Sequence, residues 1–190
     1  MGTYELIKKR RTIRKFQQKK IDRDTLLKMV EAARLAPSAS NMQPLKYIII
    51  DDSSKAEQVF AHLKWAAHIA PEGTPGEGEK PVAYIIILVD KEIRGSGYEI
   101  DIGAASQNII LTALEEGIGS CLFGAIDREG LRKALNIPER YLINNVVALG
   151  YPAESPVAEE ENGSIKYYKD ENGVLHVPKR KLEDIILKLE

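Results

Sequence analysis

The stretch Val82-Ala83-Tyr84-Ile85-Ile86-Ile87-Leu88-Val89 decides the fold of this chain. It is almost wholly apolar and rich in β-branched residues, which favour strands. A strand that carries apolar side chains on both faces must be covered on both sides, so this stretch predicts a central strand between two layers. It is the longest apolar run in the chain and is far too short to span a membrane as a helix.

Length and charge predict a single domain over residues 1–190. Hydrophobic residues make up 44% and charged residues 29% of the chain, which is ordinary for a globular protein. The net charge of -1 provides no overall field that would favour nucleic acid or membrane partners. Cys121 is the single cysteine, which excludes an intrachain disulfide and a cysteine-rich metal site. The N-terminus lacks a signal-peptide core, so a cytoplasmic location is expected.

Helices and short strands are predicted around the central strand. Helical spacing of apolar residues predicts helices over 4–9, 22–36, 53–68, 99–116, 128–135 and 182–189. Short apolar runs predict strands over 45–50, 121–123 and 145–149. The helix over 99–116 is apolar on most sides, which predicts a position in the centre of the protein or at a subunit contact. The class is therefore α+β or α/β, with a small sheet wrapped by helices.

Two basic clusters lie near the two ends of the chain. Arg10, Arg11 and Arg14 surround Thr12, and a second cluster follows at 179–181. Guanidinium groups match the geometry of phosphate oxygens, and threonine adds a hydroxyl donor. Together the clusters predict the two halves of a phosphate clamp. A solvated basic face is the alternative for the first cluster alone, while the neutral total charge argues against nucleic acid.

A rigid polar segment joins the helix at 22–36 to the strand at 45–50. It reads Pro37-Ser38-Ala39-Ser40-Asn41-Met42-Gln43-Pro44. Such a segment can present hydroxyl, amide and backbone N–H groups to a planar heterocycle. An ordinary capped turn is the alternative interpretation.

In their order and spacing, these motifs resemble the nitroreductase-like flavoprotein family. The resemblance rests on the segments at 10–16 and 36–44, on Gly117-Ile118-Gly119-Ser120-Cys121-Leu122-Phe123-Gly124, and on Pro178-Lys179-Arg180-Lys181-Leu182. It implies an α+β nitroreductase-like fold with a small, mostly antiparallel sheet wrapped by helices. It also implies an intertwined homodimer with FMN at the subunit interface.

The resemblance further implies which residues bind FMN. The phosphate and ribityl chain would be held by Arg10, Arg11, Thr12 and Arg14, and from the other end of the chain by Lys179, Arg180 and Lys181. The ring edge would be contacted from the other subunit by Pro37, Ser38, Ala39, Ser40, Asn41 and Gln43. The ring face would be covered by Leu122, Phe123, Gly124 and Ala125, with a backbone N–H of Gly124 or Ala125 near flavin N5.

The implied activity is a ping-pong reaction of NAD(P)H with a small-molecule acceptor such as a nitroaromatic, a quinone or free flavin. No catalytic side chain and no metal ligand is predicted, because the cofactor carries the chemistry. Many relatives have an aromatic residue where this chain has Leu45, so Phe123 is expected to supply that contact. The Gly- and Pro-rich segment 70–81 is a candidate lid. A flavin carrier or sensor and a flavin-free anion or nucleic-acid binding module remain as alternatives.

Overall fold

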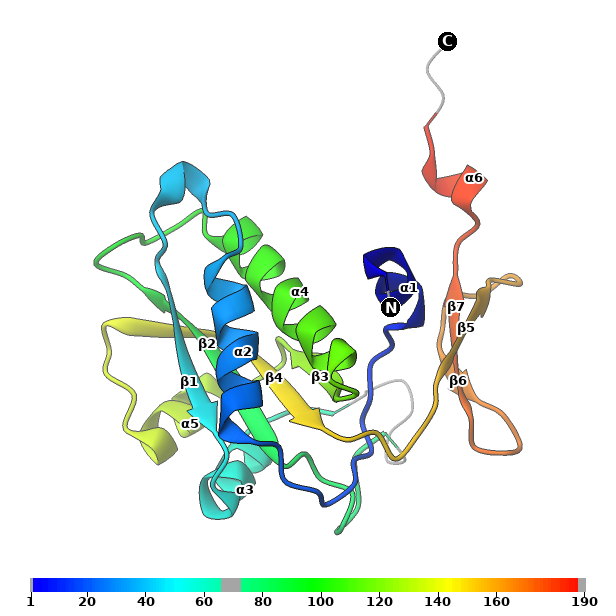
Figure 1. Ribbon diagram of the computed structural model, residues 1–190, viewed down its shortest axis with the longest axis horizontal. Coiled ribbons are helices and arrows are strands. Elements are labelled where there is room, and N and C mark those ends of the chain that lie inside the picture. Colours follow the sequence, from blue (N-terminus) through cyan, green and yellow to red (C-terminus); the bar gives the residue numbers. More distant parts are fainter. Residues whose placement is uncertain (1, 66–72, 188–190) are drawn as a thin grey trace.

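The computed structural model describes residues 2–65 and 73–187 (Figure 1). Its centre is a four-stranded sheet with the order β1-β2-β4-β3, in which each neighbouring pair is antiparallel. The strands are β1 (Leu45–Ile50), β2 (Ala83–Asp90), β3 (Gly119–Phe123) and β4 (Tyr141–Gly150). The predicted α+β class with a mostly antiparallel sheet is confirmed.

Strand β2 is the central strand that the sequence predicts. Every residue from Ala83 to Asp90 is buried, and the strand pairs with β1 on one side and β4 on the other. Successive side chains of a strand point to opposite faces. Accordingly, Tyr84, Ile86 and Leu88 join one buried cluster, whereas Ala83, Ile85 and Ile87 join a second cluster across the sheet.

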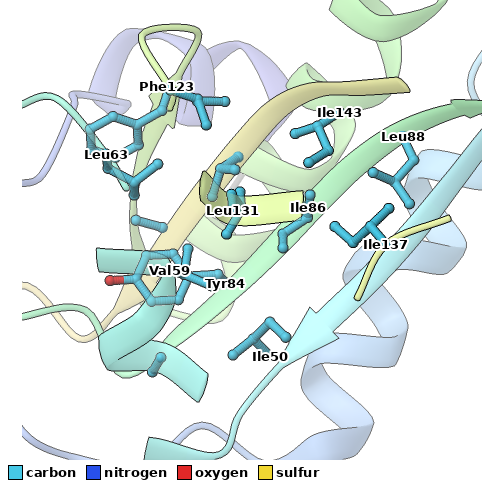
Figure 2. Packing of buried hydrophobic residues seen from close by; sticks show 14 of the residues in the cluster. Ile50, Val59, Leu63, Tyr84, Ile86, Leu88, Phe123, Leu131, Ile137 and Ile143 are labelled. Carbon is cyan, nitrogen blue, oxygen red and sulfur yellow. The ribbon is translucent and has the colours of Figure 1, made fainter. Parts of the chain in front are cut away.

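Two helical layers cover these faces. On one face lie α3 (Ser53–Ala61) and α5 (Arg128–Leu135), whose Val59 and Leu131 pack among the side chains of β2 (Figure 2). On the other face lie α2 (Arg23–Arg34) and α4 (Glu99–Glu115), which also pack against each other. The broad apolar surface of α4 is buried as expected, and Gly117, with a φ of 71°, follows the end of the helix.

The N-terminal segment adds to the β3 edge of the sheet. After α1 (Thr3–Lys9), Thr12 forms a parallel bridge with Ser120, and the N–H of Ile13 donates to the Ser120 carbonyl at 2.9 Å. Two paired glycines, Gly119 and Gly150, make this approach possible. A Cβ on Gly119 would meet Ile13 at 2.7 Å, and one on Gly150 would meet Phe16 at the same distance.

A small second sheet follows β4, which the sequence analysis did not predict. Its strands are β5 (Val157–Glu160), β6 (Tyr168–Lys169) and β7 (Leu175–Lys179), in the order β5-β7-β6. Beyond it, α6 (Leu182–Ile185) stands away from the four-stranded sheet (Figure 1).

Two predicted helices are shorter than expected. The helix expected over 53–68 ends at Ala61, and residues 62 and 63 turn towards the segment after β3, where Leu63 bridges Ile126. The helix expected over 182–189 is the single turn α6, whose apolar side chains are exposed because no described part of the chain packs on them. Residues 66–68 and 188–189 of these predictions lie outside the described residues. Within 2–65 and 73–187, no helix is long and apolar enough to cross a membrane.

Candidate cofactor site

Three arginines gather where α1 ends and the chain meets β3. Arg10 follows the last turn of α1, and Arg10, Arg11 and Arg14 are all partly buried. None of these guanidinium groups pairs with a carboxylate in the described part of the chain. Partial burial lowers the pKa of Arg11, and the neighbouring charge of Arg10 lowers it further. The cluster therefore concentrates positive charge without a direct ion pair, although the Glu154 carboxylate lies close to it.

The backbone beneath this cluster is held in place by acidic side chains. Glu154 accepts hydrogen bonds from the backbone N–H groups of Arg14 and, at 3.2 Å, of Lys15. The ammonium of Lys15 in turn pairs with Glu79 at 2.9 Å. A cavity of about 200 Å³ lies beside the cluster and is lined by Arg10, Arg11, Ser120, Glu154 and their neighbours.

The predicted ring-facing stretch Leu122 to Ala125 lies on the same edge. Because the bridge between Thr12 and Ser120 is parallel, the chain runs from Thr12 to Arg14 as β3 runs from Ser120 to Leu122. The side chain of Leu122 is 44% exposed there. The structure therefore brings the first basic cluster and the ring-facing stretch together along one sheet edge.

The carbonyl groups of this stretch are occupied, whereas two of its N–H groups are available. The carbonyls of Phe123, Gly124 and Ala125 accept hydrogen bonds of 3.0 to 3.1 Å from Asn145 Nδ2, Arg128 Nη2 and Lys64 N. The N–H groups of Gly124 and Ala125 have no acceptor within residues 2–65 and 73–187. These bonds fix the backbone, and the two N–H groups stay available as donors in the described part of the chain.

The aromatic contact expected of Phe123 is not supported. Its ring is buried in the cluster beneath α3 and α5, where it packs edge-on against Trp65 with 4.7 Å between ring centroids. Phe123 and Leu122 point to opposite faces of β3 because they are neighbours in a strand. Only the backbone of Phe123 and the side chain of Leu122 are therefore presented at the edge.

The segment at 37–44 forms a tight turn that is tied to the first turn of α4. The hydroxyl of Ser38 donates to Asp101 Oδ2 at 2.6 Å, and the Ala39 N–H donates to Asp101 Oδ1 at 3.1 Å. Ser40, Asn41 and Gln43 have φ values of 54°, 53° and 51°. Left-handed backbone costs about 1–2 kcal/mol for a residue other than glycine. Three such residues in one turn indicate a conformation that its surroundings impose.

This turn and the arginine cluster lie at different ends of α4. Asp101 is in the first turn of the helix, whereas Ile110 and Leu114, further along it, line the cavity beside Arg10 and Arg11. A helix rises 1.5 Å per residue, so Asp101 and Ile110 are separated by about 14 Å along the axis. Within one chain, the predicted ring-edge residues therefore do not meet the predicted phosphate ligands.

A groove of about 740 Å³ runs beside the turn, between α2, β1 and α4. Pro37, Ser38 and Gln43 line it together with Asp101 and Tyr47. Burial raises the pKa of Tyr47 to about 12, and the charge of Asp101 adds to this effect. Tyr47 is therefore neutral at physiological pH.

The second basic cluster at 179–181 is exposed, at the end of β7. No hydrogen bond joins it to Arg10, Arg11 or Arg14 in the described part of one chain. The small sheet approaches the arginines through Tyr167 instead, whose ring centroid lies 5.3 Å from the guanidinium carbon of Arg14. The two halves of the clamp are thus near the same side of the molecule, but their meeting at one phosphate remains a prediction.

The remaining candidates for chemistry have structural surroundings. His62 contacts Asp127 at 3.0 Å, and His176 lies between Glu159 at 2.7 Å and Asp170 at 3.4 Å. The pKa of His176 is raised, chiefly by its hydrogen bond to Glu159. Burial raises the pKa of the Cys121 thiol to about 12. His68 and residues 70–72 of the candidate lid lie outside the described residues, so the lid stays a prediction.

Asp101 is the functional candidate that the sequence analysis missed. It is a lone carboxylate beside the apolar face of the helix at 99–116, and it is 2% exposed. A charged side chain at a buried helical position needs polar partners, and this signal could have identified it. Its partner, Ser38, lies 63 residues away, so their contact could not be found from sequence spacing.

The fold and the arginine-rich edge are matched by a known family. The family model for the nitroreductase family matches residues 7–151. The chain belongs to the nitroreductase family, as the sequence motifs predicted.

Individual relatives agree with this assignment. A protein of Methanothermobacter thermautotrophicus, provisionally named NADH dehydrogenase/NAD(P)H nitroreductase, is 33% identical over 161 residues, which cover 82% of this chain and 80% of the relative. The structure of an FMN-dependent nitroreductase from Clostridium difficile R20291 matches with a TM-score of 0.64 at 26% identity, covering 84% of this chain and 90% of the other. A provisionally named nitroreductase from Desulfovibrio desulfuricans, solved with FMN, has a TM-score of 0.72 at 24% identity over 100% and 98% of the two chains and supports the fold alone.

Proposed function

We propose that this chain is an FMN-dependent NAD(P)H oxidoreductase that transfers two electrons to a small-molecule acceptor in a ping-pong reaction. Nitroaromatics, quinones and free flavins are the acceptor classes. The observation that carries the proposal is the edge of β3. There the segment with three guanidinium groups runs parallel to the strand that leads to Gly124 and Ala125. Among the described residues, the guanidinium groups pair with no carboxylate and these two N–H groups have no acceptor. Membership of the nitroreductase family and the names of the relatives support it.

The donor set fits FMN. The phosphate of FMN carries about two negative charges at neutral pH, and Arg10, Arg11 and Arg14 have no carboxylate partners that would compete for them in the described part of the chain. Thr12 adds a hydroxyl beside them. Guanidinium groups form paired hydrogen bonds with phosphate oxygens, which fixes orientation as well as position. Lys179, Arg180 and Lys181 are exposed and would add to the same charge.

The chain's own groups would orient the ring and shield it from water. When bound, FMN supplies the two-electron redox chemistry. The N–H groups of Gly124 and Ala125 would donate hydrogen bonds to the ring, near N5. The side chain of Leu122 would cover apolar ring surface. No side-chain acid or base is assigned, because the groups proposed to contact the ring from this edge are backbone donors and an aliphatic side chain.

The proposed site is completed by a second chain. Pro37, Ser38, Ala39, Ser40, Asn41 and Gln43 would contact the ring edge of the cofactor that the other subunit holds. The separation of about 14 Å along α4 between this turn and the arginine cluster supports a site split between subunits. Cofactor binding would then be coupled to dimerisation.

Colour and bleaching test the proposal. The purified protein should bind FMN at one site per chain and show the absorbance of oxidised flavin. Under anaerobic conditions, NADH or NADPH should bleach that absorbance, and a nitroaromatic or quinone should restore it. Colourless protein that does not take up added FMN would contradict every flavin-based function. Protein that binds FMN but is not bleached by either nucleotide would indicate a flavin carrier instead.

A double-mutant cycle tests the phosphate clamp. Arg14→Ala and Lys181→Ala should each weaken FMN binding about tenfold, since each removes a charged partner of the phosphate. Because both would act on one phosphate, the double variant should show a coupling of at least about 0.5 kcal/mol. FMN dissociation constants of the four proteins measure this term. Additive effects, or no loss of affinity, would contradict a shared phosphate site.

A further inference from the structure

Asp101 is a buried carboxylate that has no cationic partner in the described part of the chain. It is 2% exposed and lies in the first turn of α4. The partial positive charge of a helix N-terminus stabilises a carboxylate at such a position. Its remaining stabilisation comes from the Ser38 hydroxyl at 2.6 Å and the Ala39 N–H at 3.1 Å. A buried charge is costly unless it is hydrogen-bonded, so these contacts bind the turn firmly to the helix.

The Ser38 hydroxyl extends this contact across the whole turn. It donates to Asp101 and at the same time accepts a hydrogen bond from the Gln43 N–H at 2.9 Å. The hydrogen bond between Ser38 and Gln43 closes a loop of the backbone. Three residues of this loop have left-handed backbone: Ser40, Asn41 and Gln43. Such a backbone persists only where its surroundings impose it. The Asp101 carboxylate holds the start of the turn, and through Ser38 it also holds the end.

This network changes the role expected of Ser38. A hydroxyl has one hydrogen to donate, and the hydrogen of Ser38 is directed to Asp101. Ser38 therefore does not donate to a ligand. Ser40 and Asn41 are exposed at the tip of the turn. Asn41 Oδ1 accepts a hydrogen bond from Gln43 Nε2 at 3.1 Å, so the Ser40 hydroxyl and the Asn41 Nδ2 group are the donors left for a ligand.

We infer that Asp101 is a positioning residue of the flavin site, which fixes the 38–43 turn so that Ser40 and Asn41 are presented to the cofactor of a second chain. The inference rests on the proposed function. It assigns Asp101 a role in orientation, without contact to the cofactor or to the reacting atoms.

Two variants of Asp101 and one control test this role in the full chain. Asp101→Asn keeps the shape of the side chain but only one acceptor oxygen, whereas Asp101→Ala removes both acceptors. Glu99→Gln is the matched control, because Glu99 is an exposed carboxylate in the same helical turn and makes no side-chain hydrogen bond or ion pair with the 38–43 turn among the described residues. For each protein, the FMN dissociation constant, the visible spectrum of bound FMN and the melting temperature without FMN are measured.

Positioning predicts a graded loss of FMN binding. Asp101→Ala should weaken FMN binding about tenfold or more, and Asp101→Asn should recover part of that affinity. Both should shift the absorbance of bound flavin, because the ring edge loses its fixed donors, while Glu99→Gln should match the wild type. A second readout needs no flavin: amide exchange at 39–43 should be faster in Asp101→Ala than in the wild type.

The outcomes separate this inference from the proposed function. A wild-type protein that binds no FMN would overturn the proposed function, and the inference would fall with it. A wild-type protein that binds FMN, together with Asp101 variants of unchanged affinity and spectrum, would overturn only the inference. A lower melting temperature in the variants with unchanged FMN binding would give Asp101 a purely structural role and would also overturn it.

Discussion

The buried carboxylate of Asp90 shows how one residue secures the end of the central strand. Asp90 is fully buried, and Arg140 donates two hydrogen bonds to it at 2.8 and 2.6 Å. The hydrogen bond from Arg140 is the main cause that lowers the pKa of Asp90. The N–H of Asp90 also donates to the Pro44 carbonyl at 2.8 Å, so the same residue anchors the end of the 37–44 segment.

The pair of Asp90 and Arg140 makes stability depend on pH. Because the pKa of Asp90 is lower in the folded state, its stabilisation is present above the unfolded value of about 3.9 and is lost as the pH falls through the folded value. Arg140→Ala should therefore lower the melting temperature clearly at pH 7 and less at an acid pH below the folded pKa of Asp90. Arg23→Ala is the control, because its pair with Asp51 is partly exposed to solvent and should contribute little. An equal effect of Arg140→Ala at both pH values would contradict this account.

Single residues differ in how far the sequence reveals them. Arg10, Arg11 and Arg14 could be selected because like charges cluster within five positions. The structure places the segment that carries them along the edge of β3, the strand that leads to Gly124 and Ala125. The partners of Asp101 and Asp90 could not be selected, because Ser38 and Arg140 are distant from them in sequence. A buried ion pair or hydrogen bond depends on the fold that brings its members together, and no local pattern reports it.

At the scale of elements, the junction between the N-terminal segment and the sheet depends on two glycines, which have no side chain. Gly119 and Gly150 lie opposite each other in β3 and β4, and the side chains of Ile13 and Phe16 occupy the space above them. The segment that carries the arginine cluster can lie this close only because both positions are glycine.

Gly150→Ala should disturb this junction. The new Cβ would meet Phe16 Cδ1 at 2.7 Å and Phe16 Cβ at 2.9 Å, so the buried Phe16 must move. We expect a loss of about 1–3 kcal/mol in the free energy of unfolding, the range for overpacked cores. Urea denaturation measures it. Gly103→Ala is the control, because a Cβ there meets no atom within 4 Å and should stabilise α4 by about 0.5–1 kcal/mol. Equal effects at both glycines would contradict the steric explanation.

Elements with strong apolar patterns were predictable, whereas those with mixed composition were not. Strand β1 was predicted at its observed bounds and β2 within one residue at each end. Strand β4 begins at Tyr141, four residues before the predicted start, because Asn144 and Asn145 interrupt its apolar pattern while β2 still pairs with it. The sheet of β5, β6 and β7 was missed because its strands are short and polar, and because Pro178 lies within β7.

At the scale of the molecule, the two ends of the chain are held very differently. The segment with Arg14 is fixed on the sheet edge, whereas α6 carries its apolar side chains into solvent. Leu182, Ile185 and Ile186 are 70%, 63% and 53% exposed. Apolar residues grouped on one exposed element indicate an interaction surface. We expect a second copy of the chain to cover them, in keeping with the predicted homodimer.

Sedimentation velocity tests this expectation. The wild-type protein should be a dimer at micromolar concentration. Leu182→Glu combined with Ile185→Glu should raise the dissociation constant of the dimer at least about a hundredfold, because two buried aliphatic side chains contribute about 1.5–3 kcal/mol each. Glu183→Gln, on the same helical turn, should leave the dimer unchanged. A wild-type monomer, or a double variant that dimerises normally, would contradict the prediction.

A single chain brings together only one part of the proposed site. Motif order identified both the arginine cluster and the 37–44 segment, but these motifs do not meet within one chain. In the proposed site, their meeting would depend on the arrangement of two copies, which no spacing within one sequence records. The fold class could be predicted because it follows from apolar patterns within a single chain.

The packing of Trp65 provides the protein with an intrinsic optical reporter. Trp65 is the single tryptophan of the chain, and its ring touches Phe123 at the start of the Phe123 to Ala125 stretch. All ultraviolet-excited indole emission therefore originates beside the sheet edge to which we assign the cofactor. Oxidised flavin absorbs where indole emits, so occupancy of that edge would dim the emission by energy transfer. Loading, release and subunit exchange could then be followed in real time without an attached dye.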